Sequence, residues 1–323
     1  MSHMNICNSK HYKENVGESK NPRLSIIIVS YNTRDITHDC LKSIYNARWR
    51  DEFEVIIVDN NSHDGSVEMI KKEFPAVKII VNKENNLFAI ANNQGAKIAH
   101  GDYLLLLNSD TLVYEDNLQK MIDFFDKQKD NIICIGPKIL NKDGSLQSCG
   151  MSEFGSLFQH FVNLYHLNRI LPLHIFCAPL RRNPDRSHRT GWVLGACMMV
   201  KRKLYEKVGG LNEKLIFYGE EPEFGFRTKK LGYKTIYFSE ASIIHLGGMS
   251  TDKKIRDFEK DIAEYNSIIQ QTIGIRKAIK VAKKTICALK FKRFLHPNKQ
   301  FFDDRISHET KVIKYFEQKL KNI

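Results

Sequence analysis

The chain has 323 residues, 42% of them hydrophobic, which is enough for one large domain with an appendage or for two small domains. No window holds eighteen uninterrupted apolar residues, and residues 1–23 are polar, so the sequence predicts neither a membrane-spanning helix nor a cleaved signal peptide. The net charge of +13 is concentrated near the C-terminus, because residues 276–323 hold fourteen Lys or Arg against four Asp or Glu, a net of +10.

Seven cysteines are scattered along the chain without CxxC spacing. This pattern predicts reduced thiols in a cytoplasmic protein rather than a disulfide framework or a zinc site. We expect each cysteine to pack as a small apolar residue.

Two apolar stretches early in the chain, residues 24–32 and 53–62, close on polar residues that a buried strand would not carry. They predict adjacent parallel strands of an α/β sheet. Ligands of open α/β sheets bind beyond the carboxyl ends of such strands. The sequence therefore predicts a binding crevice that Tyr31 and Asp59 face.

Helical and strand patterns then alternate along the chain. We expect helices at 65–73, 88–99 and 116–127, and strands at 77–82, 103–107 and 132–135. This alternation predicts a doubly wound α/β sheet. Residues 141–189 break the rhythm and are expected to form a loop-rich insertion.

A second organised block begins at residue 191 with GWVLGACMMVKR and ends in two predicted strands, KTIYFS and ASIIHLGG. Between them, Phe224, Phe226 and Leu231 recur among charged residues, which predicts a short amphipathic helix with Pro222 in its first turn. The glycine pairs 209–210 and 247–248 are expected to form turns.

The strand YLLLL runs directly into Asn108, Ser109 and Asp110. An acid in this place emerges at the same sheet edge as Tyr31 and Asp59, and its hard oxygen atoms suit Mg²⁺ or Mn²⁺. The alternative is a turn or helix N-cap at the start of the next segment.

Taken together, the segments SYN, VDNNSHDGS, ENNLFAIANNQGA, YLLLLNSD, WVLGA, GGLNE, YGEEPEFGFR and IIHLGGMS resemble the inverting glycosyltransferases of family two, which have the GT-A fold. The chain is most similar to the bacterial rhamnosyltransferase-type members, which build surface polysaccharides. The resemblance covers roughly residues 23–250. It implies a Rossmann-like, mostly parallel α/β sheet flanked by helices.

The resemblance also implies a domain organisation. A polar segment, 1–22, precedes a catalytic domain at 23–250, with a nucleotide-binding half at about 23–140 and an acceptor-binding half at about 190–250. A basic helical extension, 251–323, follows.

Site residues carry over by position. The resemblance implies that a nucleoside diphosphate sugar contacts Tyr31, Asn32, Asp59, Asn85, Asn93, Asn108, Ser109 and Asp110. It implies that Asp110 and His245 hold Mg²⁺ or Mn²⁺, and that Glu221 is the catalytic base. The acceptor would contact Trp192, Gly195, Glu220 and Arg227.

The chemistry explains these residue types. A cation at Asp110 stabilises the charge that develops on the leaving diphosphate. A carboxylate at Glu221 takes the proton of the attacking acceptor hydroxyl. Direct attack from the opposite face inverts the anomeric carbon.

Structural alternatives stand beside several of these assignments. Trp192 and Gly195 equally suit a core aromatic residue and a turn, and His245 equally suits a hydrogen-bonded core histidine. The acids at 220 and 221 also suit a helix N-terminus, which favours negative charge.

The chain departs from the family pattern at four positions. Leu87 stands where many relatives have glycine, and Asn212 and Glu221 each replace a frequent aspartate. Asn108 leaves the metal motif with a single acid.

From residue 275 the C-terminal sequence alternates apolar and basic residues with helical spacing. Ile275, Ile279, Ala282, Ile286 and Leu289 share one stripe, and several lysines lie off it. Residues 275–295 therefore predict an amphipathic helix that binds an anionic membrane surface, peripheral on the inner face of the plasma membrane. The alternative is packing on the catalytic domain or on a second protomer in a homodimer. Nucleic acid is not expected as the partner of this tail.

These features predict an enzyme that moves a sugar, with L-rhamnose as one candidate, from a nucleoside diphosphate sugar to a hydroxyl of a saccharide or polyprenyl-linked acceptor in bacterial surface polysaccharide synthesis. The alternatives are a non-catalytic sugar-nucleotide or glycan-binding relative, and a hexosyl or galactofuranosyl transferase with the same fold. A nucleotidyltransferase is disfavoured, because SYNTRD lacks the expected lysine- and glycine-rich loop.

Overall fold

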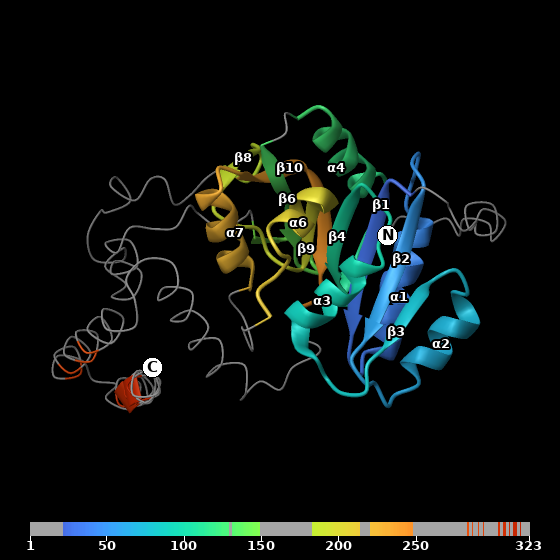
Figure 1. The fold of residues 1–323 in the computed structure, drawn as a ribbon, viewed down its shortest axis with the longest axis horizontal. Coiled ribbons are helices and arrows are strands. Elements are labelled where there is room, and N and C mark those ends of the chain that lie inside the picture. Colours follow the sequence, from blue (N-terminus) through green and yellow to red (C-terminus); the bar gives the residue numbers. More distant parts are fainter. Residues whose placement is uncertain are drawn as a thin grey trace. The chain divides into compact units, whose positions relative to one another are not determined.

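The chain is built on one mixed β-sheet, described in a computed structural model for residues 22–128, 131–148, 183–213 and 220–247 and for isolated positions beyond residue 282. Its N-terminal part has four parallel strands in the order β3-β2-β1-β4 (Figure 1). Their bounds are β1 Leu24–Ser30, β2 Phe53–Asp59, β3 Lys78–Val81 and β4 Tyr103–Asn108. The predicted parallel pairing of the first two strands is confirmed.

The rest of the sheet mixes directions. β9 (Cys197–Lys201) runs antiparallel to both β4 and β6 (Ile132–Leu140), and β10 (Lys234–His245) runs parallel to β6. Three short strands pair antiparallel with this part: β5 Thr111–Leu112 and β8 His188–Thr190 with β10, and β7 Leu146–Ser148 with β6. The predicted α/β class is therefore confirmed, with a mixed sheet.

Helices connect these strands. They are α1 Arg34–Asn46, α2 Ser66–Glu73, α3 Leu87–Lys97, α4 Asn117–Asp126, α6 Arg202–Lys207 and α7 Glu220–Lys230. The helices predicted at 65–73, 88–99 and 116–127 are confirmed as α2, α3 and α4, with ends that differ by one or two residues. None of the helices within the described residues is long and apolar enough to cross a membrane.

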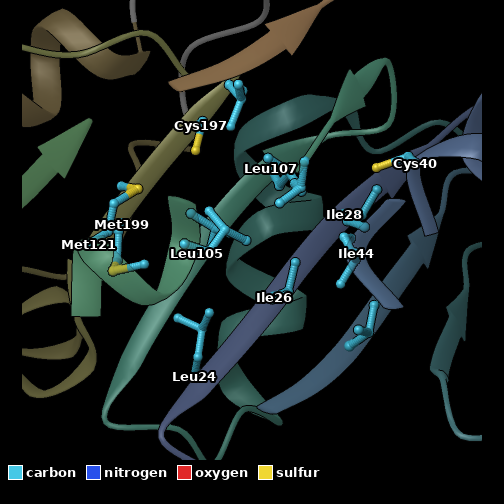
Figure 2. Close-up of a cluster of buried hydrophobic side chains, with 14 of the residues drawn as sticks. Leu24, Ile26, Ile28, Cys40, Ile44, Leu105, Leu107, Met121, Cys197 and Met199 are labelled. Carbon is cyan, nitrogen blue, oxygen red and sulfur yellow. The ribbon is translucent and has the colours of Figure 1, made fainter. Parts of the chain in front are cut away.

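Side chains of the central strands alternate between two cores, because successive strand residues point to opposite faces. Leu24, Ile26 and Ile28 of β1 belong to one cluster, with Cys40 and Ile44 of α1 (Figure 2). The other cluster contains further strand residues, several alanines of α3, and aromatic residues of α6 and α7: Ile27, Val58, Ala89, Ala91, Tyr205 and Phe224. Each fully buried large apolar side chain stabilises the fold by about 1.5–3 kcal/mol, so the sheet edge beyond β1 and β2 has a rigid base.

Three cysteines lie in described residues, and all three are buried and free: Cys40, Cys134 and Cys197. Burial raises the pKa of the Cys40 thiol to about 12. For these three residues, the prediction of small apolar core positions is confirmed.

Some sequence predictions are wrong in detail. KTIYFS and ASIIHLGG form one strand, β10, whose pairing with β6 shifts register between Phe238 and Ser242. This irregularity accommodates the polar residues between Phe238 and Ser242, which in the sequence suggested a break between two strands. The strand predicted at 132–135 continues to Leu140, and Leu231 lies beyond the end of α7 with 59% of its surface exposed.

The chain divides by contacts into two units, each described by itself. The first comprises Met1–Phe154, Pro179–Lys214 and Phe224–Ser250, and the second comprises Gly155–Ala178, Leu215–Glu223 and Thr251–Ile323. The segment 1–21, most of the insertion predicted at 141–189 and nearly all of the basic tail lie outside the described residues.

Candidate functional site at the carboxyl ends of the parallel strands

The loops that follow β1 and β2 are joined by hydrogen bonds. The Asn32 backbone N–H donates to Ser62 Oγ (2.8 Å), and Asn32 Oδ1 accepts from the His63 backbone N–H (2.8 Å). The Arg34 backbone N–H donates to Asp64 Oδ2 (2.8 Å). Asn32 has a φ of 51°, a left-handed conformation that asparagine tolerates better than most residues. Asn32 thus links the two loops through both its backbone and its side chain.

Asp59 is the last residue of β2 and is fully buried. Its Oδ1 accepts the Ser62 backbone N–H (2.9 Å), whereas its Oδ2 is buried and has no hydrogen-bond partner among the described residues. A buried polar atom without a partner costs about 1–3 kcal/mol, and more when it is charged. Tyr31, after the end of β1, has 37% of its surface exposed. The described residues therefore leave one acceptor oxygen of Asp59 without a hydrogen bond.

A network of side-chain amides supports the loop beside Asp59. Asn82 Nδ2 donates to Asn60 Oδ1 (2.9 Å) and to Gln94 Oε1 (2.9 Å), and Asn60 Nδ2 donates to Asn85 Oδ1 (3.1 Å). Asn85 Oδ1 also accepts the Leu87 backbone N–H (3.0 Å). Asn60 and Asn82 directly follow the strands β2 and β3, but the sequence pattern gave neither residue a role in the site.

Leu87 has a φ of 62°, in the left-handed region that glycine adopts without strain. This conformation is the one that favours glycine, the residue that the family resemblance implies at this position. Leu87 adopts this strained backbone conformation at the first residue of α3.

Asn93 is buried and points away from solvent into a different network. Its Oδ1 accepts from Tyr205 Oη (2.6 Å) and from the Leu211 backbone N–H (3.0 Å), and its Nδ2 donates to the Leu211 carbonyl (2.9 Å) and Glu213 (2.9 Å). A Cβ at Gly210 would lie 2.5 Å from Asn93 Oδ1, so only glycine fits there. Asn93 therefore links α3 to the loop after α6 by hydrogen bonds.

Asp110 and His245 meet on the other side of β1 from Asp59. His245 Nε2 lies 3.2 Å from Asp110 Oδ1 and 3.4 Å from Asn108 Nδ2. The pairing of β5 with β10 sets Thr111 opposite His245, and the Leu246 backbone N–H donates to the Asp110 carbonyl (2.9 Å). His245 therefore contacts polar groups at the strand end rather than an apolar core.

The sheet register fixes how far apart these groups are. Asp59 and Asn108 pair with the last two residues of β1 from opposite sides. Two strand spacings separate them by about 10 Å, which suits the length of a nucleoside diphosphate. Ser109 follows Asn108 and is buried, with its hydroxyl 3.4 Å from that of Thr33.

The Asp110 and His245 pair fits a divalent cation. Neighbouring ligands of an octahedral ion, each about 2.1 Å from it, lie about 3 Å apart, close to the observed 3.2 Å. Within the described ranges no group of three or more His, Cys, Asp or Glu side chains is gathered around one point. A cation here would have two protein ligands and would need others from water or substrate phosphates, as Mg²⁺ often does.

Glu220 and Glu221 occupy the first turn of α7 and belong to the second unit. Glu220 is 3% exposed, whereas Glu221 is partly exposed. Burial, followed by the negative charge of Glu221, raises the pKa of Glu220 well above its ordinary value. The charged form of Glu220 is therefore disfavoured, and Glu221 is the more exposed carboxylate of the pair.

Glu220→Gln is expected to stabilise the protein increasingly as the pH rises. A raised folded-state pKa means that the stability from protonated Glu220 is complete below its ordinary pKa of 4.5 and falls as the pH climbs toward the folded value. Glutamine does not ionise, so the variant does not lose this stability. The difference in free energy of unfolding between variant and wild type should therefore grow by up to about 1.4 kcal/mol per pH unit. Urea unfolding of both proteins at several pH values measures it, and a pH-independent difference would contradict the assignment.

Arg227 ties α7 to the loop after α6. Its guanidinium donates to the carbonyl groups of Val208 and Gly210, the latter at 2.7 Å, and lies 5.6 Å from the centre of the Phe224 ring. This places Arg227 in a supporting position, where the resemblance had suggested acceptor contact.

The segment around Trp192 packs closely on α7. A Cβ at Gly225 would lie 2.3 Å from the Gly191 carbonyl oxygen and 3.0 Å from Trp192 Cβ, so glycine is required at this contact. Trp192 is half-buried, and Gly195 is buried.

Comparison with known proteins agrees with this architecture. Residues 25–209, more than half of the chain, match the family model described as Glycosyl transferase family 2. An uncharacterised glycosyltransferase of Bacillus subtilis, YfnE, is 32% identical over 115 residues, a match that covers 35% of this chain and 29% of that protein.

Two further proteins match over a larger part of the chain. The N-acetylglucosaminyl-diphospho-decaprenol L-rhamnosyltransferase of Mycobacterium tuberculosis is 24% identical over 243 residues, which cover 71% of this chain and 78% of that protein. The structure of the mannosyltransferase PcManGT from Pyrobaculum calidifontis, in complex with GDP-Man and Mn²⁺, covers 91% of this chain and 86% of its own, with a TM-score of 0.54 and 15% identity. The last likeness shows the fold.

Proposed function

The chain belongs to glycosyltransferase family 2 and has the GT-A fold, and on that premise we propose that it transfers a sugar from a nucleoside diphosphate sugar to a hydroxyl group of a saccharide or lipid-linked saccharide. The observation that carries this proposal is the arrangement on either side of β1. One side has the buried carboxylate oxygen of Asp59, which has no partner in the part of the chain that the structure describes, and the other has the Asp110 and His245 pair.

The donor would lie along this strand end. Asp59 Oδ2 accepts an N–H of the base or a hydroxyl of the ribose, and the exposed Tyr31 ring offers a surface for the base. Asn85 and the backbone of its loop border the same side. Asp110 and His245 hold the divalent cation, Mg²⁺ or Mn²⁺, which supplies stabilisation of the charge that develops on the leaving diphosphate.

Glu221 would act as the base. It takes the proton of the acceptor hydroxyl as that oxygen bonds to the anomeric carbon, while the bond from the anomeric carbon to the diphosphate oxygen breaks and its electron pair leaves with the diphosphate. Attack from the face opposite the leaving group inverts the anomeric configuration. Trp192, Gly195, Glu220 and Arg227 would form or support the acceptor side.

The similarity to the mycobacterial rhamnosyltransferase supports a deoxyhexose donor, with L-rhamnose first among the candidates, and a polyprenyl diphosphate-linked saccharide acceptor. Residues 275–295 would bring the enzyme to an anionic membrane surface that carries such an acceptor. Hexosyl and galactofuranosyl donors are the alternatives that an assay must include.

Incubation of the full chain and Mn²⁺ with a panel of donors and a polyprenyl diphosphate N-acetylglucosamine acceptor tests the function. We expect a new disaccharide lipid by mass spectrometry, with anomeric configuration opposite to the donor's by NMR. Nucleotide binding without transfer from any donor would favour the non-catalytic alternative, and retained configuration would exclude Glu221 as the base of a direct displacement.

A further inference from the structure

Gln147 lies on the far side of the His245 ring from Asp110. Gln147 is exposed on β7, the short strand that follows the turn after β6. Its Oε1 is 2.7 Å from His245 Nδ1, which is the ring nitrogen that does not face Asp110. The sequence analysis assigned this strand to a loop-rich insertion and gave Gln147 no role.

The orientation of the Gln147 amide is fixed by its other contacts. Its Nε2 donates to Asn141 Oδ1 (2.9 Å) and to the His245 carbonyl oxygen (3.3 Å). Both partners are acceptors, so the amino group must face them and the Oε1 atom must face His245 Nδ1. Asn141 is held in turn, because its Nδ2 donates to Ser145 Oγ (2.9 Å).

This orientation determines the tautomer of the neutral imidazole. An acceptor at 2.7 Å requires the hydrogen on Nδ1, so the Nε2 lone pair points toward Asp110 and Asn108. Two electron-pair donors, Nε2 and Asp110 Oδ1, then face each other at 3.2 Å. A cation between them relieves their repulsion, and a hydrogen-bond acceptor on Nδ1 makes the ring a stronger ligand.

We infer that Gln147 is a positioning residue that sets the tautomer and direction of His245 for cation binding. The inference rests on the proposed function. It implies that a residue of β7, a strand that does not supply a metal ligand, affects the affinity for the metal. Loss of such an outer partner typically weakens metal binding about 10- to 100-fold. Because Gln147 is exposed and water can replace part of its contact, we expect the lower end of that range.

Three variants of the full chain separate this role from a merely structural one. Gln147→Leu removes the acceptor for Nδ1–H and both donated hydrogen bonds. Gln147→Glu keeps the acceptor but loses the donors to Asn141 and to the His245 carbonyl. Leu146→Ala changes an exposed neighbour on the same strand, 42% exposed, as the matched control.

The dissociation constant for Mn²⁺ is measured from the electron paramagnetic resonance signal of the free ion. Separate titrations contain saturating UDP, dTDP or GDP. We expect Gln147→Leu to bind Mn²⁺ about 10-fold more weakly, and Gln147→Glu and Leu146→Ala to bind it like the wild type. If Gln147→Glu is as weak as Gln147→Leu, the donors matter and the tautomer role is overturned.

The same titration distinguishes a failure of the role of Gln147 from a failure of the proposed metal-assisted function. Wild-type binding that His245→Ala abolishes but Gln147→Leu leaves unchanged would overturn this inference and leave the proposed function standing. Absence of Mn²⁺ binding by the wild type with all three nucleotides would overturn both the metal-assisted function and the inference.

Discussion

Glu221→Gln is expected to lower the rate of sugar transfer about 10²- to 10⁴-fold at saturating substrates, because the acceptor hydroxyl loses its general base. Glutamine keeps the size and hydrogen-bonding reach of the side chain but has no basic oxygen. Donor affinity should not change, since the nucleotide is proposed to bind at Asp59 and Asp110. The neighbouring Glu220 is a poor substitute, because it is buried and burial disfavours its charged form.

The turnover number and the donor dissociation constant, measured on the same preparation, test this prediction. Glu223→Gln is the matched control, because it removes the same charge from the first turn of the same helix. A Glu221→Gln enzyme that keeps at least half of the wild-type rate would mean that another group, or water, takes the proton. Equal losses in both variants would point to the charge at the helix N-terminus instead.

Asp110→Asn is expected to abolish metal-dependent donor binding and to reduce transfer by at least about 10³-fold. An amide is a poor ligand for a hard cation, and the cation contributes several kcal/mol to stabilising the leaving diphosphate, where each 1.4 kcal/mol is about tenfold in rate. Asparagine has nearly the shape of aspartate, so the fold should survive at this buried position.

Asp116→Asn serves as the control for the Asp110 variant. Asp116 is a nearby acid whose only described ion pair is with Lys120 (2.9 Å), and its loss should leave both donor binding and transfer unchanged. Mn²⁺ affinity and transfer rate are measured for all three proteins. An Asp110→Asn enzyme with wild-type Mn²⁺ dependence would place the cation elsewhere.

The sheet could be predicted from the sequence, because strands that are buried on both faces are recognisable as apolar runs of strand length. The strands of the parallel half are continuous apolar runs that end in polar residues, as at Asp59 and Asn108. β10 could not be predicted as one strand, because its polar middle is accommodated by a register irregularity that depends on its partner, β6.

The roles of polar residues were harder to predict than their positions. Asn93 and Arg227 stand where the family pattern suggests substrate contacts, yet their described partners are carbonyl, amide and side-chain groups of the protein itself. Gln147 could not be predicted because a single glutamine on a short, exposed strand has no distinguishing spacing, and only the tertiary contact with His245 reveals it. The left-handed conformation of Leu87 likewise became evident only from its backbone angle, whereas the turn at glycines 209 and 210 was predicted and is confirmed.

The central claim is that the edge beyond β1, β2 and β4 binds a nucleoside diphosphate together with a divalent cation. A thermal-shift titration with UDP, dTDP and GDP, each with Mn²⁺ and again with EDTA, tests it most directly, because a ligand that binds only the folded protein raises its melting temperature. We predict a rise with at least one nucleotide, most of which EDTA removes and which Asp59→Asn diminishes. No rise with any nucleotide, or a rise that EDTA and Asp59→Asn leave intact, would contradict the account.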